Sequence, residues 1–161
     1  FFGQLGLAFA ATDNVKFSGN IWEDADPDFA NYNYNYDVVY THIAVKAKLF
    51  AKWTETTHPY VGASAGVGFN RAHNFFISPR IPEAVPAPPF TAKTTDGAFA
   101  YTLEAGLQHV IDTHWRGGVG YEFADWGASS LGRAPGQTLN SGLAFSHLYT
   151  KGVQFNLTYV V

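Results

Sequence analysis

Hydrophobic and polar residues alternate along most of this chain. In the stretch WRGGVGYEF, from Trp115 to Phe123, large apolar residues take nearly every second position, and Arg116, Gly120 and Glu122 fall between them. Successive side chains of a β-strand point to opposite faces of the sheet, so this stretch predicts a strand with one apolar face. The same alternation predicts strands at about 1–10, 35–49, 59–71, 98–110, 115–126 and 145–160.

The segments between these strands differ in length in a regular way. Long connections cover about 11–34, 72–97 and 127–144, whereas those at about 50–58 and 111–114 are short. Long loops at one end of a sheet and short turns at the other are typical of outer-membrane β-barrels. A water-soluble β-sandwich gives no reason for its loops to be sorted by length in this way.

Sorting the strands by alternate positions separates two sets of side chains. The small or polar set is rich in glycine and amides, and its charged members include Lys46, Lys48, Glu104 and Glu122. The bulky apolar set comprises Leu5, Leu7, Phe9, Val39, Ile43, Val45, Ala47, Leu49, Val61, Ala63, Ala65, Val67, Phe69, Phe99, Tyr101, Leu103, Ala105, Leu107, Val119, Tyr121, Phe123, Val153, Phe155, Leu157 and Tyr159.

In a water-soluble sheet the bulky set would form the core. Two features favour the reverse arrangement, with the bulky set facing lipid. Several strands exceed the roughly 9–11 residues that a tilted membrane strand needs. The aromatic residues also sort by depth into two girdles around an aliphatic band, as a bilayer selects. The predicted girdles are Tyr60, Trp115 and Tyr159 at the short-turn end, and Phe69, Phe99, Phe123 and Tyr149 at the loop end.

These patterns predict an all-β fold, an antiparallel transmembrane β-barrel with an up-and-down meander, as a single domain over residues 1–161. A sheet in lipid must have no free edge, because unpaired backbone groups there cost several kcal/mol. About six strands cannot readily close, since the smallest common membrane barrel has roughly eight. We therefore expect an additional N-terminal hairpin, with pairing of strand edges between copies of the chain as the alternative.

The chain contains, from one end to the other, the pieces GQLGLAFAAT, SGNIWEDADPDFANY, THIAVKAKL, YVGASAGVGFNRAH, WRGGVGYEFADWG, LGRAPGQTL and HLYTKGVQFNLTYVV. Together they resemble the OmpA/OmpX-like outer-membrane β-barrel family of Gram-negative bacteria. The resemblance implies a barrel of about eight strands in the bacterial outer membrane, of which this chain supplies about six and lacks the first two. One departure from the family pattern is that Tyr159 is followed by Val160 and Val161, where family members usually end on an aromatic residue.

Charged residues on the inward face form the main candidate site, a cluster of Lys46, Glu104, Arg116 and Glu122. Glu104 and Glu122 fall nearly opposite each other on neighbouring predicted strands. Two buried carboxylates so close cannot both ionise cheaply without a cation between them, and Lys46 and Arg116 are the candidates. The sequence favours a salt-bridge network that fills the barrel interior and leaves an ion gate or proton site as the alternative.

No motif points to catalysis or to a cofactor. The acidic run at Glu23, Asp24, Asp26 and Asp28 resembles a calcium loop, but Phe29 takes the place of the glycine an EF-hand turn requires. A looser cation site that bridges lipopolysaccharide phosphates stays open. Ser146 and His147 are adjacent, and adjacent residues of a strand point to opposite faces, so we expect no nucleophile–base pair there.

Composition narrows the classes further. Charged residues make up 14% of the chain, well below the roughly one quarter of a soluble domain, while aromatic residues reach 17%. The net charge of -3 gives no basic face for nucleic acid, and the absence of cysteine excludes thiol chemistry. We therefore expect a non-enzymatic outer-membrane protein that contacts lipid and lipopolysaccharide and presents its long loops to an unidentified partner. The alternatives are a lipid-modifying enzyme, a soluble lipocalin-like binder and a narrow ion channel.

Overall fold

The computed structural model describes residues 1–22, 26–85, 87–138 and 142–160, and nearly all of its regular structure is β-strand. No helix among these residues is long and apolar enough to cross a membrane. The elements are β1 (Phe2–Ala11), β2 (Val15–Ile21), a short 3₁₀ helix η2 (Pro27–Phe29), β3 (Tyr32–Phe50), β4 (Thr57–Pro79), β5 (Lys93–Val110), β6 (Trp115–Asp125), β7 (Ser129–Ser130), β8 (Ala144–Phe145) and β9 (Tyr149–Tyr159).

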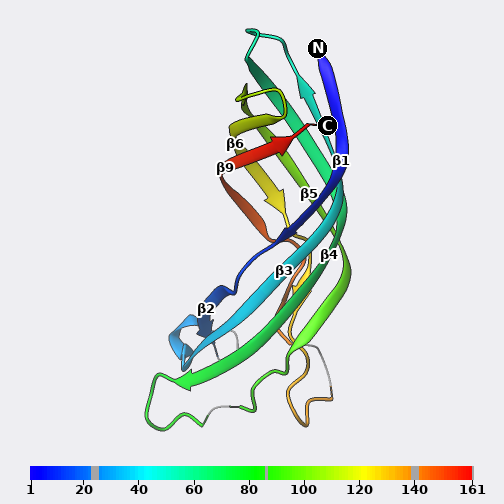
Figure 1. Cartoon of the computed structure of the whole chain (residues 1–161). Helices are drawn as coiled ribbons and strands as arrows, with labels where there is room; N and C mark the ends of the chain where they lie inside the picture. The colour runs from blue at the N-terminus through cyan, green and yellow to red at the C-terminus, as the bar shows by residue number, and fades with distance from the viewer. Residues whose placement is uncertain (23–25, 86, 139–141, 161) are drawn as a thin grey trace.

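The main sheet is an antiparallel meander in the order β1-β3-β4-β5-β6-β9, with β2 paired to the first part of β3. The short turns and both termini lie at one end, and the long connections lie at the other (Figure 1). The all-β antiparallel fold predicted from the alternation is therefore confirmed. The structure shows an open sheet rather than a closed barrel, because no ladder joins β1 to β9.

The strands extend further into the long connections than the sequence predicts. The predicted loop 11–34 contains β2, and the predicted loop 72–97 contains the end of β4 and the start of β5. The predicted loop 127–144 holds β7 and the start of β8. The prediction missed these parts because it followed the bulky outward-facing residues, whereas in β2 the larger side chains, Val15 and Phe17, pack against the core.

The bulky set faces outward, as the alternation predicts. Leu7 is 85% exposed and Phe155 is 81% exposed, whereas Glu104 and Gln108 are 5% and 1% exposed. These four residues lie in the half of the sheet nearer the short turns, called the short-turn half below, and the half nearer the long connections is called the loop half. Because charged and amide side chains are normally the exposed ones in water, the short-turn half is inverted relative to a soluble protein. A lipocalin-like binder requires the opposite arrangement, with the bulky face lining the interior.

The sheet curls strongly, so that strands far apart in its order meet across the concave side (Figure 1). The Nδ2 of Asn156 on β9 donates a hydrogen bond of 3.1 Å to the Tyr60 hydroxyl on β4. The two edge strands also approach each other, since Gln4 of β1 and Thr158 of β9 line one small cavity of about 120 Å³. The alternating strand directions leave β1 and β9 antiparallel to each other.

A conventional hydrophobic core lies on the concave side near the long loops. Tyr36, Val38, Tyr40, Ala72 and Leu131 are buried and contact one another, and parts of β2, β8 and the long connections pack against them. Leu131 is held by its backbone N–H, which donates to the Leu143 carbonyl at 2.8 Å. The sequence does not predict this core, because the segments that cover it lie in the predicted loops.

One predicted girdle residue is placed wrongly by the sequence analysis. Tyr60 is only 3% exposed and faces the concave side, since it pairs with Phe50 and shares the parity of the inward residues. Of the other predicted girdle residues, Phe69, Phe99, Trp115, Tyr149 and Tyr159 are exposed, and Phe123 is half-buried.

Candidate functional site

A charged cluster occupies the concave side of the short-turn half. The strand register places Lys48, Gly62, Glu104 and Glu122 in one row across β3, β4, β5 and β6. Residues in one row of a sheet lie on the same face, about 5 Å from strand to strand. Lys46 lies two residues from Lys48 on β3 and therefore shares this face, so the register alone brings both lysines and both glutamates together.

The Glu104 carboxylate is the centre of the cluster. Its side chain is fully buried, and the Nζ of Lys46 donates to its Oε2 at 2.9 Å. The Nζ of Lys48 lies 3.2 Å from Oε1, an ion pair that lacks the angles of a hydrogen bond. Glu122 is more loosely held, with its Oε2 3.8 Å from the Nζ of Lys46 and 29% of its side chain exposed. Two cations thus compensate two adjacent carboxylates.

Glycines make the room that these side chains occupy. A Cβ added at Gly62 would lie 2.6 Å from Oε1 and 2.9 Å from Cγ of Glu104. A Cβ at Gly120 would lie 2.7 Å from the Tyr60 hydroxyl and 2.8 Å from the Ala105 carbonyl oxygen. The glycines of the inward set therefore let long polar side chains from other strands fill the concave side.

Arg116 does not join this cluster, contrary to the sequence analysis. It lies at the start of β6, six residues from Glu122, which corresponds to roughly 20 Å along a strand. Among the described residues, no ion pair involves Arg116. Lys48 is instead the second cation of the cluster, the role that the sequence predicted for Arg116. The inward parity of Lys48 was visible in the sequence, but its row depends on the β3–β4 register, which the sequence did not fix.

Further polar pairs extend the network on the concave side. The hydroxyls of Ser64 and Thr102 are 2.7 Å apart, and the Nε2 of Gln108 donates to Thr158 Oγ1 at 3.2 Å. The ammonium of Lys48 also lies 4.4 Å from the ring centroid of Tyr60. These contacts satisfy part of the polar side chains on this face, while the Oε1 of Gln108 has no hydrogen-bond partner among the described residues.

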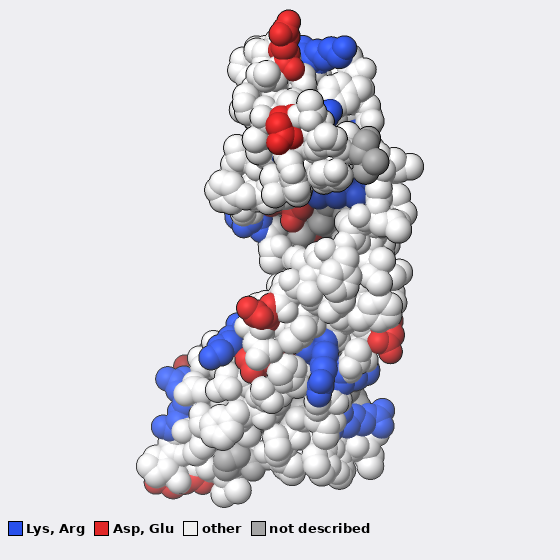
Figure 2. All heavy atoms as spheres, viewed as in Figure 1, with Lys and Arg blue, Asp and Glu red and all other residues white. Residues whose placement is uncertain are grey.

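Aromatic side chains close the concave side at both ends of the cluster. Toward the short turns, Phe50 is 1% exposed and stacks on Phe2, with ring centroids 4.9 Å apart, and it also contacts Tyr60. Toward the long loops, the ring of Tyr40 lies 6.0 Å from that of Trp126. In the space-filling view, charged atoms border a hollow at mid-height (Figure 2).

The hydrophobic core near the long loops contains a tyrosine, Tyr36, whose pKa is raised. Tyr36 is flanked on β3 by the outward-facing polar residues Asn35 and Asp37, which places it beyond the apolar outer band. Burial raises the pKa of Tyr36 to about 12, and the neighbouring phenol of Tyr34 adds to the effect.

A contact between His147 and Asp125 lies at the boundary between the short-turn half and the loop half. The Nδ1 of His147 is 2.7 Å from Oδ2 of Asp125, and Oδ1 of the buried Asp125 accepts from the Gly127 N–H at 2.9 Å. The imidazole is half exposed and stacks in parallel on Tyr149. Ser146 and His147 lie just after β8 and outside any strand, so strand alternation does not govern their directions. No described hydroxyl donates to the Nε2 of His147.

The acidic run is only partly visible. Glu23 and Asp24 lie outside the described residues, while Asp26 caps η2 by accepting from the Asp28 N–H at 3.0 Å. Within the described part of the chain, no group of three or more His, Asp or Glu side chains is placed to hold a metal ion.

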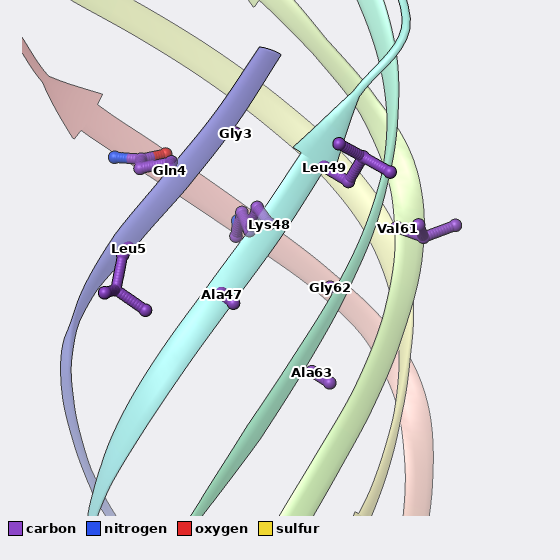
Figure 3. Close-up of a pocket in the computed structure, with 9 residues that line it drawn as sticks. All are labelled: Gly3, Gln4, Leu5, Ala47, Lys48, Leu49, Val61, Gly62 and Ala63. Carbon is purple, nitrogen blue, oxygen red and sulfur yellow. The ribbon is translucent and has the colours of Figure 1, made fainter. Parts of the chain in front are cut away.

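The outward face carries a shallow groove across β1, β3 and β4. Its volume is about 540 Å³, and Leu5, Leu49 and Val61 stand around the smaller Ala47 and Ala63 (Figure 3). Its lining is apolar apart from Gln4 and Lys48.

Comparison of the chain with protein-family models, with curated proteins and with solved structures finds no match.

Proposed function

We propose that this chain forms most of a small outer-membrane β-barrel that anchors its long loops at a bacterial surface and carries out no catalysis. The exposure of the bulky outward set is the observation that carries the proposal. Leu5, Leu103 and Phe155 are 76%, 53% and 81% exposed, and they belong to a band that runs across the sheet. Continuous apolar surface of this extent is unfavourable in water and favourable against lipid tails.

Lipid is the partner that this surface fits. The groove of Figure 3 lies in the short-turn half, where an acyl chain would fill it. At the other edge of the band, Arg71 follows Phe69 on the outward face of β4, and Lys151 lies near Tyr149 on β9. Exposed cations next to an aromatic girdle suit the phosphates of lipopolysaccharide, which supports the expected orientation with the long loops outside.

A membrane location requires cover for the free edges of β1 and β9. Their antiparallel directions allow direct pairing, an inserted hairpin or pairing with another copy. The hairpin that the resemblance implies is the cover we propose, and the inward amides of β9 support it. The Oε1 of Gln154 and the Oδ1 of Asn156 have no hydrogen-bond partner among the described residues, and neighbouring strands would supply one.

Single-cysteine labelling tests the location, because the chain has no cysteine of its own. We would compare an environment-sensitive fluorophore at Leu103→Cys with one at Asn35→Cys, both exposed outward positions. In reconstituted vesicles, a nitroxide on the lipid tails should quench the probe at position 103, and aqueous iodide should quench the probe at position 35. Equal quenching of both by iodide would contradict a membrane location.

Cysteines at Gln4 and Thr158 test the closure separately, since both residues line the cavity between β1 and β9. A disulfide within one chain would indicate direct pairing of the edges. A disulfide between chains would indicate assembly of copies. In a protein that carries the proposed hairpin, the two inserted strands would separate β1 from β9, so neither disulfide should form there.

The pair of Asp125 and His147 favours a lipid-modifying enzyme as the second candidate. A buried carboxylate that holds Nδ1 orients an imidazole as in hydrolase triads, here next to the exposed Tyr149 of the girdle. Incubation of the refolded protein with labelled lipid distinguishes the two functions. Release of a labelled product that is lost in both His147→Ala and Ser146→Ala would favour the enzyme.

A further inference from the structure

A cavity of about 680 Å³ is lined by residues of the long connections. These connections lie together at one end of the molecule (Figure 1). Five parts of the chain form the walls of the cavity: the end of β2, the start of β3, the end of β4, the connection that contains Val85 and residues 87–90, and the connection at 134–137. Its volume is within the range of about 300–1,000 Å³ that is typical of small-molecule sites. All three long connections predicted from the sequence therefore meet around one space.

The lining of this cavity is uncharged. Among the described residues that line it, only Tyr32 and Gln137 have polar side chains, and the others include Ile21, Ile77 and Val85. Phe75 and Phe90 also line it, with ring centroids 5.0 Å apart, and both pack against the hydrophobic core of the loop half. An ion would lose its hydration here without compensation, so the chemistry selects a neutral, largely apolar molecule.

Hydrogen bonds between separate segments hold the walls in place. The Tyr32 hydroxyl donates to the Val85 carbonyl at 3.1 Å, and the Gly132 N–H donates to the Thr91 carbonyl at 2.8 Å. Thr91 Oγ1 donates to the Arg133 carbonyl at 2.9 Å. Pro88 and Pro135, both in the lining, reduce the freedom of the two connections. The cavity is thus largely preformed, as ligand sites usually are.

Gln137 supplies the polar contact. Its Oε1 accepts from the Ala134 N–H at 3.0 Å, which fixes the side-chain amide against the wall. No hydrogen bond from its Nε2 to another described residue is found, so this donor is available to a guest. Val85, which is 82% exposed, adds apolar surface to the same site. An exposed apolar patch next to a preformed cavity marks a ligand site.

We propose that this cavity binds a small uncharged molecule with an aromatic or aliphatic body and one hydrogen-bond acceptor, which Gln137 Nε2 contacts. The site lies at the loop end, where Asn33 and Asn35 of β3 are exposed on the outward face of the sheet. It therefore receives its ligand from the water at the loop end and does not depend on the proposed role in the membrane.

The probe we would use is 2-naphthol, with the anion 2-naphthalenesulfonate as its charged analogue. Calorimetric titration of the refolded protein in lipid nanodiscs, with protein-free nanodiscs as the blank, should show saturable binding of one 2-naphthol per chain. The sulfonate should bind more weakly by at least about tenfold, because its charge must be desolvated. Titration in detergent micelles should give the same stoichiometry, which keeps the result independent of membrane insertion.

Three variants locate the binding. Ala87→Phe fills the cavity and should abolish binding, whereas Ala92→Phe, at an exposed position outside the lining, should leave the affinity unchanged. Gln137→Glu keeps the acceptor for the Ala134 N–H but removes the donor and adds a charge, so it should weaken binding by roughly tenfold or more. Gel mobility with and without heating would show that each variant folds.

Three results would overturn the proposal. The first is a titration that does not differ from the blank. The second is equal weakening by Ala87→Phe and Ala92→Phe, which would place the probe elsewhere. The third is equal affinity for 2-naphthol and the sulfonate, which would exclude an uncharged site.

Discussion

Along β3, the residues on the concave side change from apolar to polar near the middle of the strand, and the outward residues change in the opposite sense. In the loop half, Tyr36 and Val38 are buried while Asn35 is exposed. In the short-turn half, Lys46 faces the concave side while Val45 is 54% exposed. A single strand thus follows the rule of a soluble protein in one half and its inverse in the other, which is the change that the proposed membrane location would produce.

The two halves are held together by different interactions. In the loop half, burial of apolar side chains away from water stabilises the core. In the short-turn half, the concave side has few apolar side chains apart from Phe2, Phe50 and Tyr60, and ion pairs and amides connect the strands instead. Variants of the same kind should therefore have different effects in the two halves.

The largest effect is expected at the centre of the charged cluster. Glu104→Ala leaves Lys46 and Lys48 without their main partner, and breaking a buried ion pair on one side costs about 3–5 kcal/mol of unfolding free energy. Urea unfolding of the vesicle-inserted protein, followed by tryptophan fluorescence, measures it.

Glu122→Gln is the matched control for that variant. Its side chain is 29% exposed and lies 3.8 Å from the nearest ammonium, so the change should cost no more than about 1 kcal/mol. If both variants unfolded at the same urea concentration as the parent, the cluster would not stabilise the short-turn half.

The next largest effect tests the core of the loop half. Leu131 is fully buried, so Leu131→Ala should lower the free energy of unfolding by about 2–5 kcal/mol through lost contacts and a residual cavity. Leu157→Ala, on the outward face at 65% exposure, should cost about 1 kcal/mol or less in the same vesicle assay. A larger loss for Leu157→Ala than for Leu131→Ala would reverse the assignment of the two halves.

The medium itself is tested by adding a charge to the outward face of each half. Leu103→Arg places a guanidinium in the proposed lipid band and should cost about 2–4 kcal/mol. Asn35→Arg places the same group on the outward face of the loop half and should change stability by no more than about 0.5 kcal/mol. Equal small effects would mean that water touches both positions.

The sequence predicted the sheet from side-chain alternation, and it predicted which face is outward from the length of the strands and the sorting of the aromatic residues by depth. Leu5, Val45 and Phe155 each stand between small or polar neighbours in their own strand. This alternation can be seen without knowing which strands pair. The failure at Tyr60 shows the limit of sorting by residue type. Its parity already placed it inward, and its aromatic character led to the wrong assignment.

The site was predicted only in part because its members depend on register. Glu104 and Glu122 follow from a short turn between adjacent strands, which fixes their pairing closely. Lys48 meets Glu104 across β4, and that contact requires the exact β3–β4 ladder and the space above Gly62. The loop-half core and the cavity above it depend on contacts between distant connections, which alternation does not report.

The smallest effect is expected at the boundary of the two halves. His147→Ala removes the imidazole from Asp125, whose other oxygen keeps the Gly127 N–H. Because the imidazole is 55% exposed, solvent weakens the interaction, and the loss should be about 1 kcal/mol. Amide hydrogen exchange should rise in the segment before β9 while the core around Leu131 and the charged cluster keep their protection.

The exposed His109, which contacts Thr57, provides the control, and His109→Ala should leave the exchange of the segment before β9 unchanged. Faster exchange throughout both halves in His147→Ala would instead mean that they unfold as one unit, and the boundary would have no independent stability.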